Sequence, residues 1–439
     1  MKQQPKVPVP VGKFFARPFF APRRAHPIVR LLTLAVLAGA LTTAGGCRGK
    51  KPKAKATGEQ PPLALQTFAR QWATDLKLGR DSLRTIHVRD DTIFAFTRGG
   101  RAVSLARDSG SIQFSRPIKG GGTLLHAPIV MNEKLTIRTT REDIIVTPVI
   151  FPTATTIEIL EKGTGRFITS SDLKFTIRSD AVGRGGVLYL GGAYRGSSRA
   201  ASIDIREPYV PVRWELMTPG AAISAAPALW EDAVYFGGED GAVYAVSTAG
   251  RESIWPLPGG VFQTGAAIIG DLAIDNDNLY VASTDNKLYA LNRNSGKMRW
   301  QYFGSASMRT GPMVTSDAVY QFVPGTGLVA LDKAQGEFIR KPRWVAGNAT
   351  QLLAQDERNA YVRTRDNRIA AHDRKTGELR FTSQRRDLEV FGTNLVKEDG
   401  IIYAATKKGR VIAVRPVLKP GTVGEVVMLE FGDETLSEK

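Results

Sequence analysis

The sequence predicts an all-β fold, an eight-bladed β-propeller of four-stranded antiparallel blades, and three observations support this prediction. First, a pattern of short alternating strands separated by polar turns recurs along the chain, most clearly in DNKLYALNRNSGKMRW (285–300). Second, the aromatic residue that anchors each repeat returns at intervals that average about 44 residues. Third, no segment after residue 58 shows a sustained helical period. A period in the forties with about four strands per repeat is typical of propeller blades.

Two series of residues define the repeat. The first lies on the strand before the polar turn and consists of Phe94, Thr136, Tyr189, Tyr235, Tyr280, Tyr320, Tyr361 and Tyr403. The second lies on the strand after the second turn and consists of Phe114, Ile168, Trp214, Trp255, Trp300, Trp344 and Phe381. We expect these tryptophans to pack between blades. The remaining strand precedes the first anchor, as in ISAAPAL, and its small residues suit the crowded innermost position.

The last repeat, at Tyr403, has no tryptophan after it, whereas Trp72 precedes the first repeat at the matching distance. We therefore expect a strand that carries Trp72 to complete the last blade and close the ring. The tail EVVMLEF (425–431) is an alternative for this role. Because the repeat at Thr136 is degenerate, seven blades is an alternative to eight.

The positive charge of the chain is concentrated at its start. The formal net charge is +18, but residues 1–58 hold twelve Lys and Arg residues and no Asp or Glu. The remaining 381 residues carry a net +6, which gives no support to a nucleic-acid partner.

The N-terminus has the features of an export signal. Basic residues precede an apolar run (31–41), and small residues then lead to Cys47, the only cysteine of the chain. Ala44-Gly45-Gly46-Cys47 resembles the lipobox of bacterial lipoproteins, in which the cysteine is acylated; ordinary cleavage after Ala40 is the alternative. Arg48 stands where Asp would retain a lipoprotein in the inner membrane, which favours the outer membrane. We expect a signal peptide at 1–46, a basic tether at 47–65, the propeller at 66–418 and a C-terminal tail at 419–439.

The pattern LYALNRNSGKMRW is similar to the repeat of pyrroloquinoline-quinone (PQQ)-type propellers, and the resemblance covers about residues 66 to 418. Some members of that family are dehydrogenases that hold the quinone and a calcium ion, commonly beneath a vicinal disulfide. A single cysteine cannot form that disulfide, and Asp275 and Asp277 lack the glycine and distal glutamate of a calcium loop. The histidines show no metal-ligand spacing and stand at His26, His87, His126 and His372. We expect no cofactor, no metal and no catalytic residue.

Lipobox, tether and eight repeats together resemble the B lipoprotein of the outer-membrane β-barrel assembly machinery. That resemblance implies a non-enzymatic scaffold in the periplasm, attached to the membrane by an N-terminal lipid and bound to an envelope protein, with a β-barrel assembly component as the candidate partner. A quinoprotein-like dehydrogenase and a sensor or adhesion propeller are the alternatives.

Departures from the repeat suggest where a partner binds. The interval from Thr136 to Tyr189 is long and includes TPVIFPTATT (147–156), and AYRGSSRAA (193–201) and REPYVPV (206–212) also depart from the pattern. The candidate partner-facing residues in these segments are Tyr194, Arg195, Arg199 and Tyr209.

The lipobox leads to the first prediction: Cys47→Ser prevents acylation, so the variant accumulates as uncut precursor or as soluble protein. Membrane fractionation and the mass of the N-terminal peptide measure both outcomes. An unchanged distribution and an unchanged N-terminal mass would contradict the proposed anchor.

Overall fold

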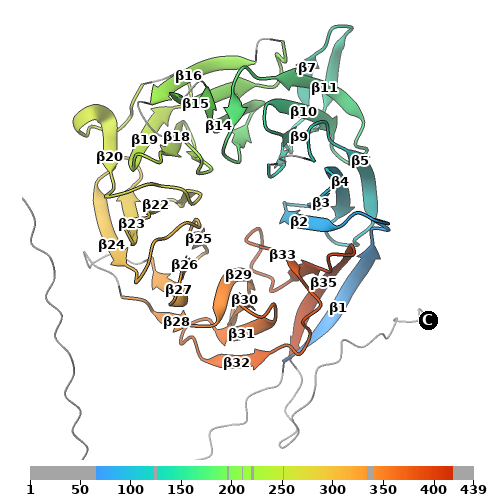
Figure 1. The fold of residues 1–439 in the computed structure, drawn as a ribbon, viewed down its shortest axis with the longest axis vertical. Helices are drawn as coiled ribbons and strands as arrows, with labels where there is room; N and C mark the ends of the chain where they lie inside the picture. The colour runs from blue at the N-terminus through green and yellow to red at the C-terminus, as the bar shows by residue number, and fades with distance from the viewer. Residues whose placement is uncertain are drawn as a thin grey trace, which may run out of the picture. The chain divides into compact units, whose positions relative to one another are not determined.

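The computed structural model describes residues 66–122, 126–194, 197–209, 211–218, 222–250, 252–333 and 341–418. These residues form eight antiparallel sheets arranged as blades around a common axis (Figure 1). The predicted eight-bladed propeller is therefore confirmed, and the seven-bladed alternative is wrong. Cys47, Arg195 and the expected signal, tether and tail lie outside the described residues.

The blades share one design, in which four strands follow one another from the axis to the rim. Their bounds, innermost strand first, are β2 (Leu83–Val88), β3 (Thr92–Thr97), β4 (Arg101–Ala106) and β5 (Ile112–Pro117) in blade 1; β6 (Ile129–Val130), β9 (Pro148–Pro152), β10 (Thr156–Glu161) and β11 (Phe167–Asp172) in blade 2; β12 (Thr176–Ile177), β14 (Val187–Tyr194), β15 (Ser197–Asp204) and β16 (Val212–Thr218) in blade 3; β17 (Ala228–Trp230), β18 (Ala233–Gly237), β19 (Ala242–Ser247) and β20 (Val261–Gln263) in blade 4; β21 (Ala273–Ile274), β22 (Asn278–Ala282), β23 (Lys287–Asn292) and β24 (Met298–Phe303) in blade 5; β25 (Met313–Val314), β26 (Ala318–Val323), β27 (Gly327–Asp332) and β28 (Trp344–Ala346) in blade 6; β29 (Ala349–Gln355), β30 (Asn359–Thr364), β31 (Ile369–Asp373) and β32 (Leu379–Thr382) in blade 7; and β33 (Val390–Gly392), β34 (Ile402–Ala405), β35 (Arg410–Leu418) and β1 (Gln66–Asp75) in blade 8. A short strand, β13 (Val182–Arg184), also pairs with β14, and a single 3₁₀ turn, η1 (Pro258–Gly260), precedes β20.

Blade 5 shows why the repeat folds in this way. Asn286 has a φ of 69°, and this positive value reverses the chain between β22 and β23. The carboxylate of Asp285 accepts hydrogen bonds from the Lys287 N–H and the Tyr289 hydroxyl, which hold the turn. Because the blade strands alternate in direction, the turn between second and third strands lies on one face of the ring. The turn between third and fourth strands lies on the opposite face.

The second blade differs from the prediction. Thr136 lies in a separate hairpin of β7 (Leu135–Arg138) and β8 (Asp143–Val146), and the register places Ile150 of β9 where the other blades have their anchor. Thr169, and not Ile168, stands opposite Ile159, at the position that a tryptophan occupies in blades 3, 5 and 6. The prediction failed because the sequence of the β7–β8 insertion alternates in the same way as that of a blade strand. The segment TPVIFPTATT, which was expected to depart from the repeat, contains β9 and the first residue of β10 and is therefore regular blade sequence. AYRGSSRAA likewise falls at the ends of β14 and β15, two strands of eight residues.

The ring closes at blade 8, as the position of Trp72 predicted. Strand β1 pairs antiparallel with β35, from Gln66 opposite Leu418 to Asp75 opposite Arg410, so the two ends of the described chain share one sheet (Figure 1). The Trp72 ring lies 6.1 Å from the Tyr403 ring.

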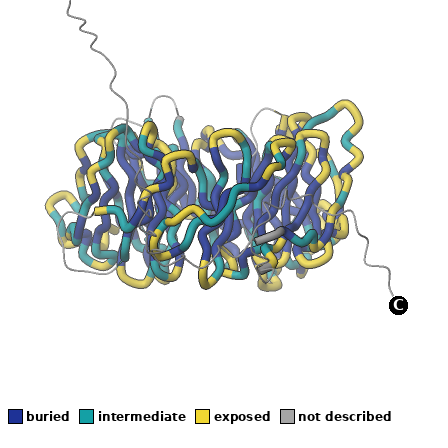
Figure 2. Tube along the Cα trace, turned by 90° about the horizontal axis from the view of Figure 1, so that it is seen from below, coloured by how far each residue is buried: buried dark blue, intermediate teal, exposed yellow. Residues whose placement is uncertain are grey.

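The core is distributed around the ring, because each of the eight blade interfaces holds its own cluster of buried apolar residues. Strands are therefore buried on both sides, and exposed residues gather in the turns of the two faces (Figure 2). At four of the described blade junctions, the outermost aromatic of one blade lies on a glycine of the next: Trp72 on Gly110, Phe114 on Gly165, Trp255 on Gly296 and Trp344 on Gly377. A Cβ on Gly110 would lie 2.3 Å from the Trp72 ring, one on Gly296 2.5 Å from Trp255, and one on Gly377 2.3 Å from Trp344.

Hydrogen bonds complete this contact. The indole N–H of Trp72 donates to the carbonyl of Arg107 at 3.0 Å, and that of Trp255 donates to the carbonyl of Arg293 at 2.8 Å. The indole of Trp214 makes the same bond to Thr248 at 3.4 Å, and Trp344 to Arg374 at 3.0 Å. Trp300 is 1% exposed and packs on Tyr280 within its own blade.

We expect Gly110→Ala to destabilise the ring by about 1–3 kcal/mol more than Gly79→Ala, because only Gly110 has a ring where its Cβ would lie. The two glycines have similar positive φ angles, +69° and +62°, and nothing lies within 4 Å of a Cβ on Gly79. Backbone strain is therefore common to both variants. Urea unfolding measures the difference, and equal losses would show that the Trp72–Gly110 contact contributes nothing.

Closure by β1 leads to a separate prediction. A chain that begins at Gln66 should keep the melting temperature of the full chain, whereas one that begins at Gly79 loses β1 and exposes the edge of β35. Differential scanning calorimetry compares the two. Equal melting temperatures would place ring closure elsewhere in the chain.

Candidate interaction surface

A groove of about 450 Å³ lies at the rim between blades 2 and 3. The segment from β11 to β12 forms one side, and the outer strands of blade 3 form the other. Leu173 and Phe175, 7% and 3% exposed, are its buried apolar residues. The lining residues are Asp172, Leu173, Lys174, Phe175, Arg199, Tyr209, Pro211, Val212 and Glu215.

Tyr209 reaches this groove from the turn between β15 and β16. The Ser171 hydroxyl of blade 2 donates to the carbonyl of Pro208 at 2.8 Å, which attaches this turn to the neighbouring blade. The carboxylate of Asp204 accepts bonds from the backbone N–H and the guanidinium of Arg206. These bonds hold the pKa of Asp204 below its ordinary value, although burial opposes them. The Asp204 N–H also donates to the Pro211 carbonyl at 2.6 Å, so Tyr209, which is 55% exposed, lies on a turn that is held at both ends.

Arg199 and Glu215 form an ion pair across β15 and β16 on the wall of the groove. Arg199 stands directly opposite Met217 in the register, so Arg199, Glu215 and Met217 share one side of the sheet. Met217 is 61% exposed. This side of the sheet therefore presents an oriented guanidinium on the groove wall and an exposed thioether beside it, both common features of protein interfaces.

Of the four predicted partner-facing residues, Arg199 and Tyr209 line this groove. Tyr194 is the last residue of β14, opposite Ser197, and its side chain lies outside the described residues, as does Arg195. Sequence reasoning missed Phe175 and Met217. Met217 was detectable, because in VRWELMT (212–218) it falls on the same side as Arg213 and Glu215, opposite to Trp214.

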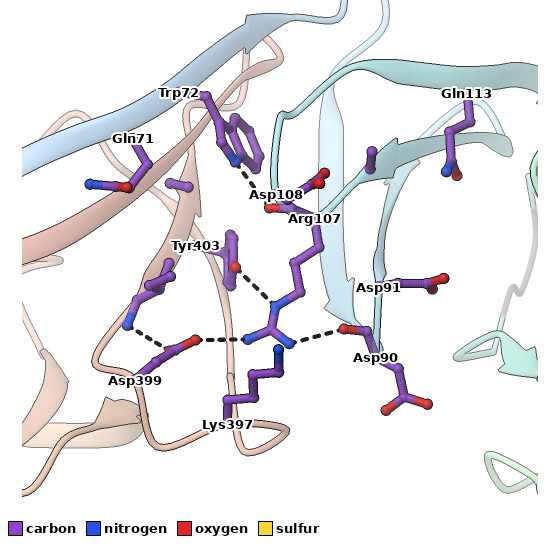
Figure 3. A pocket seen from close by; sticks show the side chains of 13 residues that line it. Gln71, Trp72, Asp90, Asp91, Arg107, Asp108, Gln113, Lys397, Asp399 and Tyr403 are labelled. Atoms are coloured by element: carbon purple, nitrogen blue, oxygen red, sulfur yellow. Dashed lines mark hydrogen bonds and ion pairs between the residues drawn. The ribbon is translucent and has the colours of Figure 1, made fainter.

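A second cavity, of about 480 Å³, lies at the ring closure between blades 8 and 1 (Figure 3). Arg107 is buried there. Its guanidinium donates to the Tyr403 hydroxyl at 3.0 Å and to the Asp90 carbonyl at 3.0 Å, and it pairs with Asp399 at 3.3 Å. Every one of these bonds is made within the protein, and together they link the first blade to the last.

The same bridge recurs at other junctions. In each case a basic residue that follows the third strand of one blade pairs with a carboxylate of the preceding blade. The pairs are Lys162–Asp91 at 2.8 Å, Arg293–Glu231 at 3.6 Å, Lys333–Asp275 at 2.8 Å and Arg374–Asp317 at 2.6 Å. Because the same ion pair occurs at several junctions, we interpret the second cavity as a structural feature of the junction between blades 8 and 1.

Titratable residues also occur on and near the innermost strands. Burial and the nearby charge of Arg89 lower the pKa of His87 to about 4. Nδ1 of His126 lies 3.1 Å from the Asp180 carboxylate, which also accepts the Ala127 N–H. Burial opposes these bonds, yet they hold the pKa of Asp180 below its ordinary value.

Within the described residues, no group of three His, Cys, Asp or Glu side chains is arranged to hold a metal ion. Asp275 and Asp277, the sequence candidates for a calcium loop, belong to the turn before β22. There Asp275 accepts the Asp277 and Asn278 N–H groups and pairs with Lys333.

Across the part of the chain that the structure describes, no helix has the length and apolar character needed to cross a membrane.

Comparisons with known proteins agree with this architecture. The crystal structure of BamB from Moraxella catarrhalis matches with a TM-score of 0.60 at 16% identity, covering 79% of this chain and 97% of that one. The computationally designed Ika8 protein matches with a TM-score of 0.56 at 14% identity, covering 77% and 98%. At these identities the two structures show the fold alone.

A search of curated protein sequences gave no match. The family model described as outer membrane protein assembly factor BamB matches residues 63–302 and 303–417, which is most of the chain. This match confirms the predicted resemblance, and the chain belongs to the family of the outer membrane protein assembly factor BamB.

Proposed function

We propose that this protein is a non-enzymatic scaffold in the bacterial cell envelope that binds a component of outer-membrane protein assembly. The observation that carries the proposal is the groove between blades 2 and 3. Family membership supports the process, because the description of the family names outer-membrane assembly. We also propose that Cys47 carries a lipid, that the ring lies in the periplasm and that the lipid is inserted in the outer membrane and not the inner membrane.

The groove suits a protein partner for three physical reasons. Its buried residues, Leu173 and Phe175, offer an apolar site that an anchoring side chain can fill. Tyr209 and Arg199, residue types enriched at binding hot spots, stand at its margin. The ion pair with Glu215 holds the Arg199 side chain, and the Ser171–Pro208 hydrogen bond holds the turn that carries Tyr209, so the entropy lost by these groups when a partner binds is reduced.

A partner is expected to use the exposed side of β16 as well. Met217 extends the groove along the rim, and the outer edge of β16 pairs with no other strand of its sheet. A seven-residue edge strand with an exposed apolar residue is open to pairing with another chain.

We expect Tyr209→Ala and Met217→Glu each to reduce co-purification of the assembly component at least tenfold, because each removes an apolar contact at the groove. Matched controls are Phe303→Ala and Leu379→Glu, which change exposed apolar residues on the outermost strands β24 and β32. All four variants should keep the melting temperature. Quantitative mass spectrometry of detergent-solubilised membranes measures the bound component.

Unchanged recovery in both groove variants would contradict the proposed site. Tight binding of PQQ together with dye-linked alcohol oxidation would contradict the non-enzymatic scaffold itself.

A further inference from the structure

One face of the ring carries an excess of positive charge over blades 7, 8 and 1. It is the face on which the second and third strands of each blade are joined and from which the chain passes to the next blade. Its exposed cations, which we call the basic face, are Lys77, Arg80, Arg98, Arg101, Lys119, Arg365, Arg386, Lys407, Lys408 and Arg410.

Backbone hydrogen bonds show that these turns form one continuous surface. The Leu83 N–H donates to the Lys407 carbonyl at 2.8 Å, and the Arg98 N–H to the Ser82 carbonyl at 2.9 Å. The Glu389 N–H donates to the Ala405 carbonyl at 2.9 Å, which joins the loop after blade 7 to blade 8.

The acidic groups of this surface do not neutralise it. Only Lys407, with Glu389, and Lys119, with Asp172 at 4.0 Å, form ion pairs with other described residues; the remaining eight cations of the basic face form none within the described chain. The carboxylates of the surface offset only half of the charge of the ten cations, since there are five of them: Asp75, Asp81, Asp366, Asp387 and Glu389.

The opposite sector of the same face has a different character. On blades 4 to 6 its charged residues are Glu239, Asp240, Asp271, Asp285, Lys287 and Arg309. The ring is therefore electrostatically asymmetric across this face, although the net charge after residue 58 is small.

We propose that the basic face lies against an anionic phospholipid surface, that of the membrane in which the chain is anchored. This inference rests on the proposed function, from which it takes the lipid anchor on Cys47. The cations are distributed over separate turns of three blades, which suits an extended layer of phosphate groups. No large apolar residue among the described ones is exposed on this surface, whereas protein interfaces carry apolar and aromatic residues at their centre. The same lack of exposed aromatic rings argues against stacking with single-stranded nucleic acid.

The length of the chain before the ring permits this orientation. Strand β1 starts at Gln66, opposite Leu418, and reaches the basic face at Asp75, opposite Arg410. The strand spans about 33 Å, whereas the residues from Cys47 to Gln66 can span at most about 65 Å. In this orientation the groove at the rim of blades 2 and 3 stays open to a protein partner.

The first test uses the full chain with Cys47→Ser, which removes the only cysteine. A fluorophore is attached through Gln384→Cys, in the loop after blade 7, or through Asn294→Cys, an exposed position on the opposite face. The vesicles contain phosphatidylcholine with about 30% phosphatidylglycerol, which makes the surface anionic, and a quencher attached to the lipid headgroups. Quenching is expected at residue 384 and not at residue 294. Equal quenching at both positions, or none at either, would overturn the proposal.

The second test measures partitioning onto the same vesicles. The triple variant Arg98→Glu, Arg365→Glu, Lys408→Glu should bind at least about tenfold more weakly than the parent chain, because each cation contributes to attraction near the surface. The matched control, Lys297→Glu, Arg358→Glu, Lys375→Glu, places the same charge change on the opposite face. The control should bind the vesicles within about twofold of the parent chain. Both triple variants keep the basic N-terminal segment, so this segment cannot account for a difference between them.

Equal binding by the two triple variants would refute the basic face as the lipid contact. Binding of poly-glutamate without binding of vesicles would assign this surface to an acidic protein instead, which also refutes the proposal. Neither result affects co-purification of the assembly component, so failure of this inference is distinct from failure of the scaffold function.

Discussion

The contact on which this structure depends is that of an aromatic ring in one blade with a glycine in the next. Trp255 on Gly296 and Trp344 on Gly377 show its geometry, in which a Cβ would overlap the ring. The indole N–H then binds a carbonyl beside that glycine. No blade buries its own core, because the apolar clusters lie between blades. Stability is therefore shared around the ring, and β1 completes it by placing Trp72 on Gly110.

A ring held in this way leaves its rim and faces available for binding. Blade 3 has the longest hairpin, and its outer strands supply the groove wall with Arg199 and Glu215, while Met217 lies beside them on the same side of the sheet. The recurrent basic bridges, such as Lys333 with Asp275, lie at blade junctions and are satisfied there. Most cations of the basic face, by contrast, form no ion pair within the described chain. Under our proposal, the charges that join the blades and the charges that contact the membrane are therefore separate sets.

Much of the fold was predictable from the sequence, because the anchor series favoured eight blades over seven and the tryptophan series favoured ring closure by the strand of Trp72 over closure by the tail 425–431; the structure decided both. The assignment of Thr136 failed, since the β7–β8 hairpin alternates as blade strands do and period alone does not separate them. Arg199 and Tyr209 were predicted from departures in the repeat, whereas Phe175 became part of the groove only through the packing of blade 2 beside blade 3. The basic face was not predictable from net charge, because Lys408 and Arg98 come together only when the ring closes.

Photo-cross-linking tests most directly whether the groove between blades 2 and 3 binds a component of outer-membrane assembly, as we propose. The most direct measurement replaces Tyr209 with a photoreactive phenylalanine derivative in cells and identifies the cross-linked protein, with the same replacement at Phe303 as reference. We expect a cross-link to an assembly component from residue 209 and none from residue 303. A cross-link from residue 303 alone, or none from either position, would contradict it.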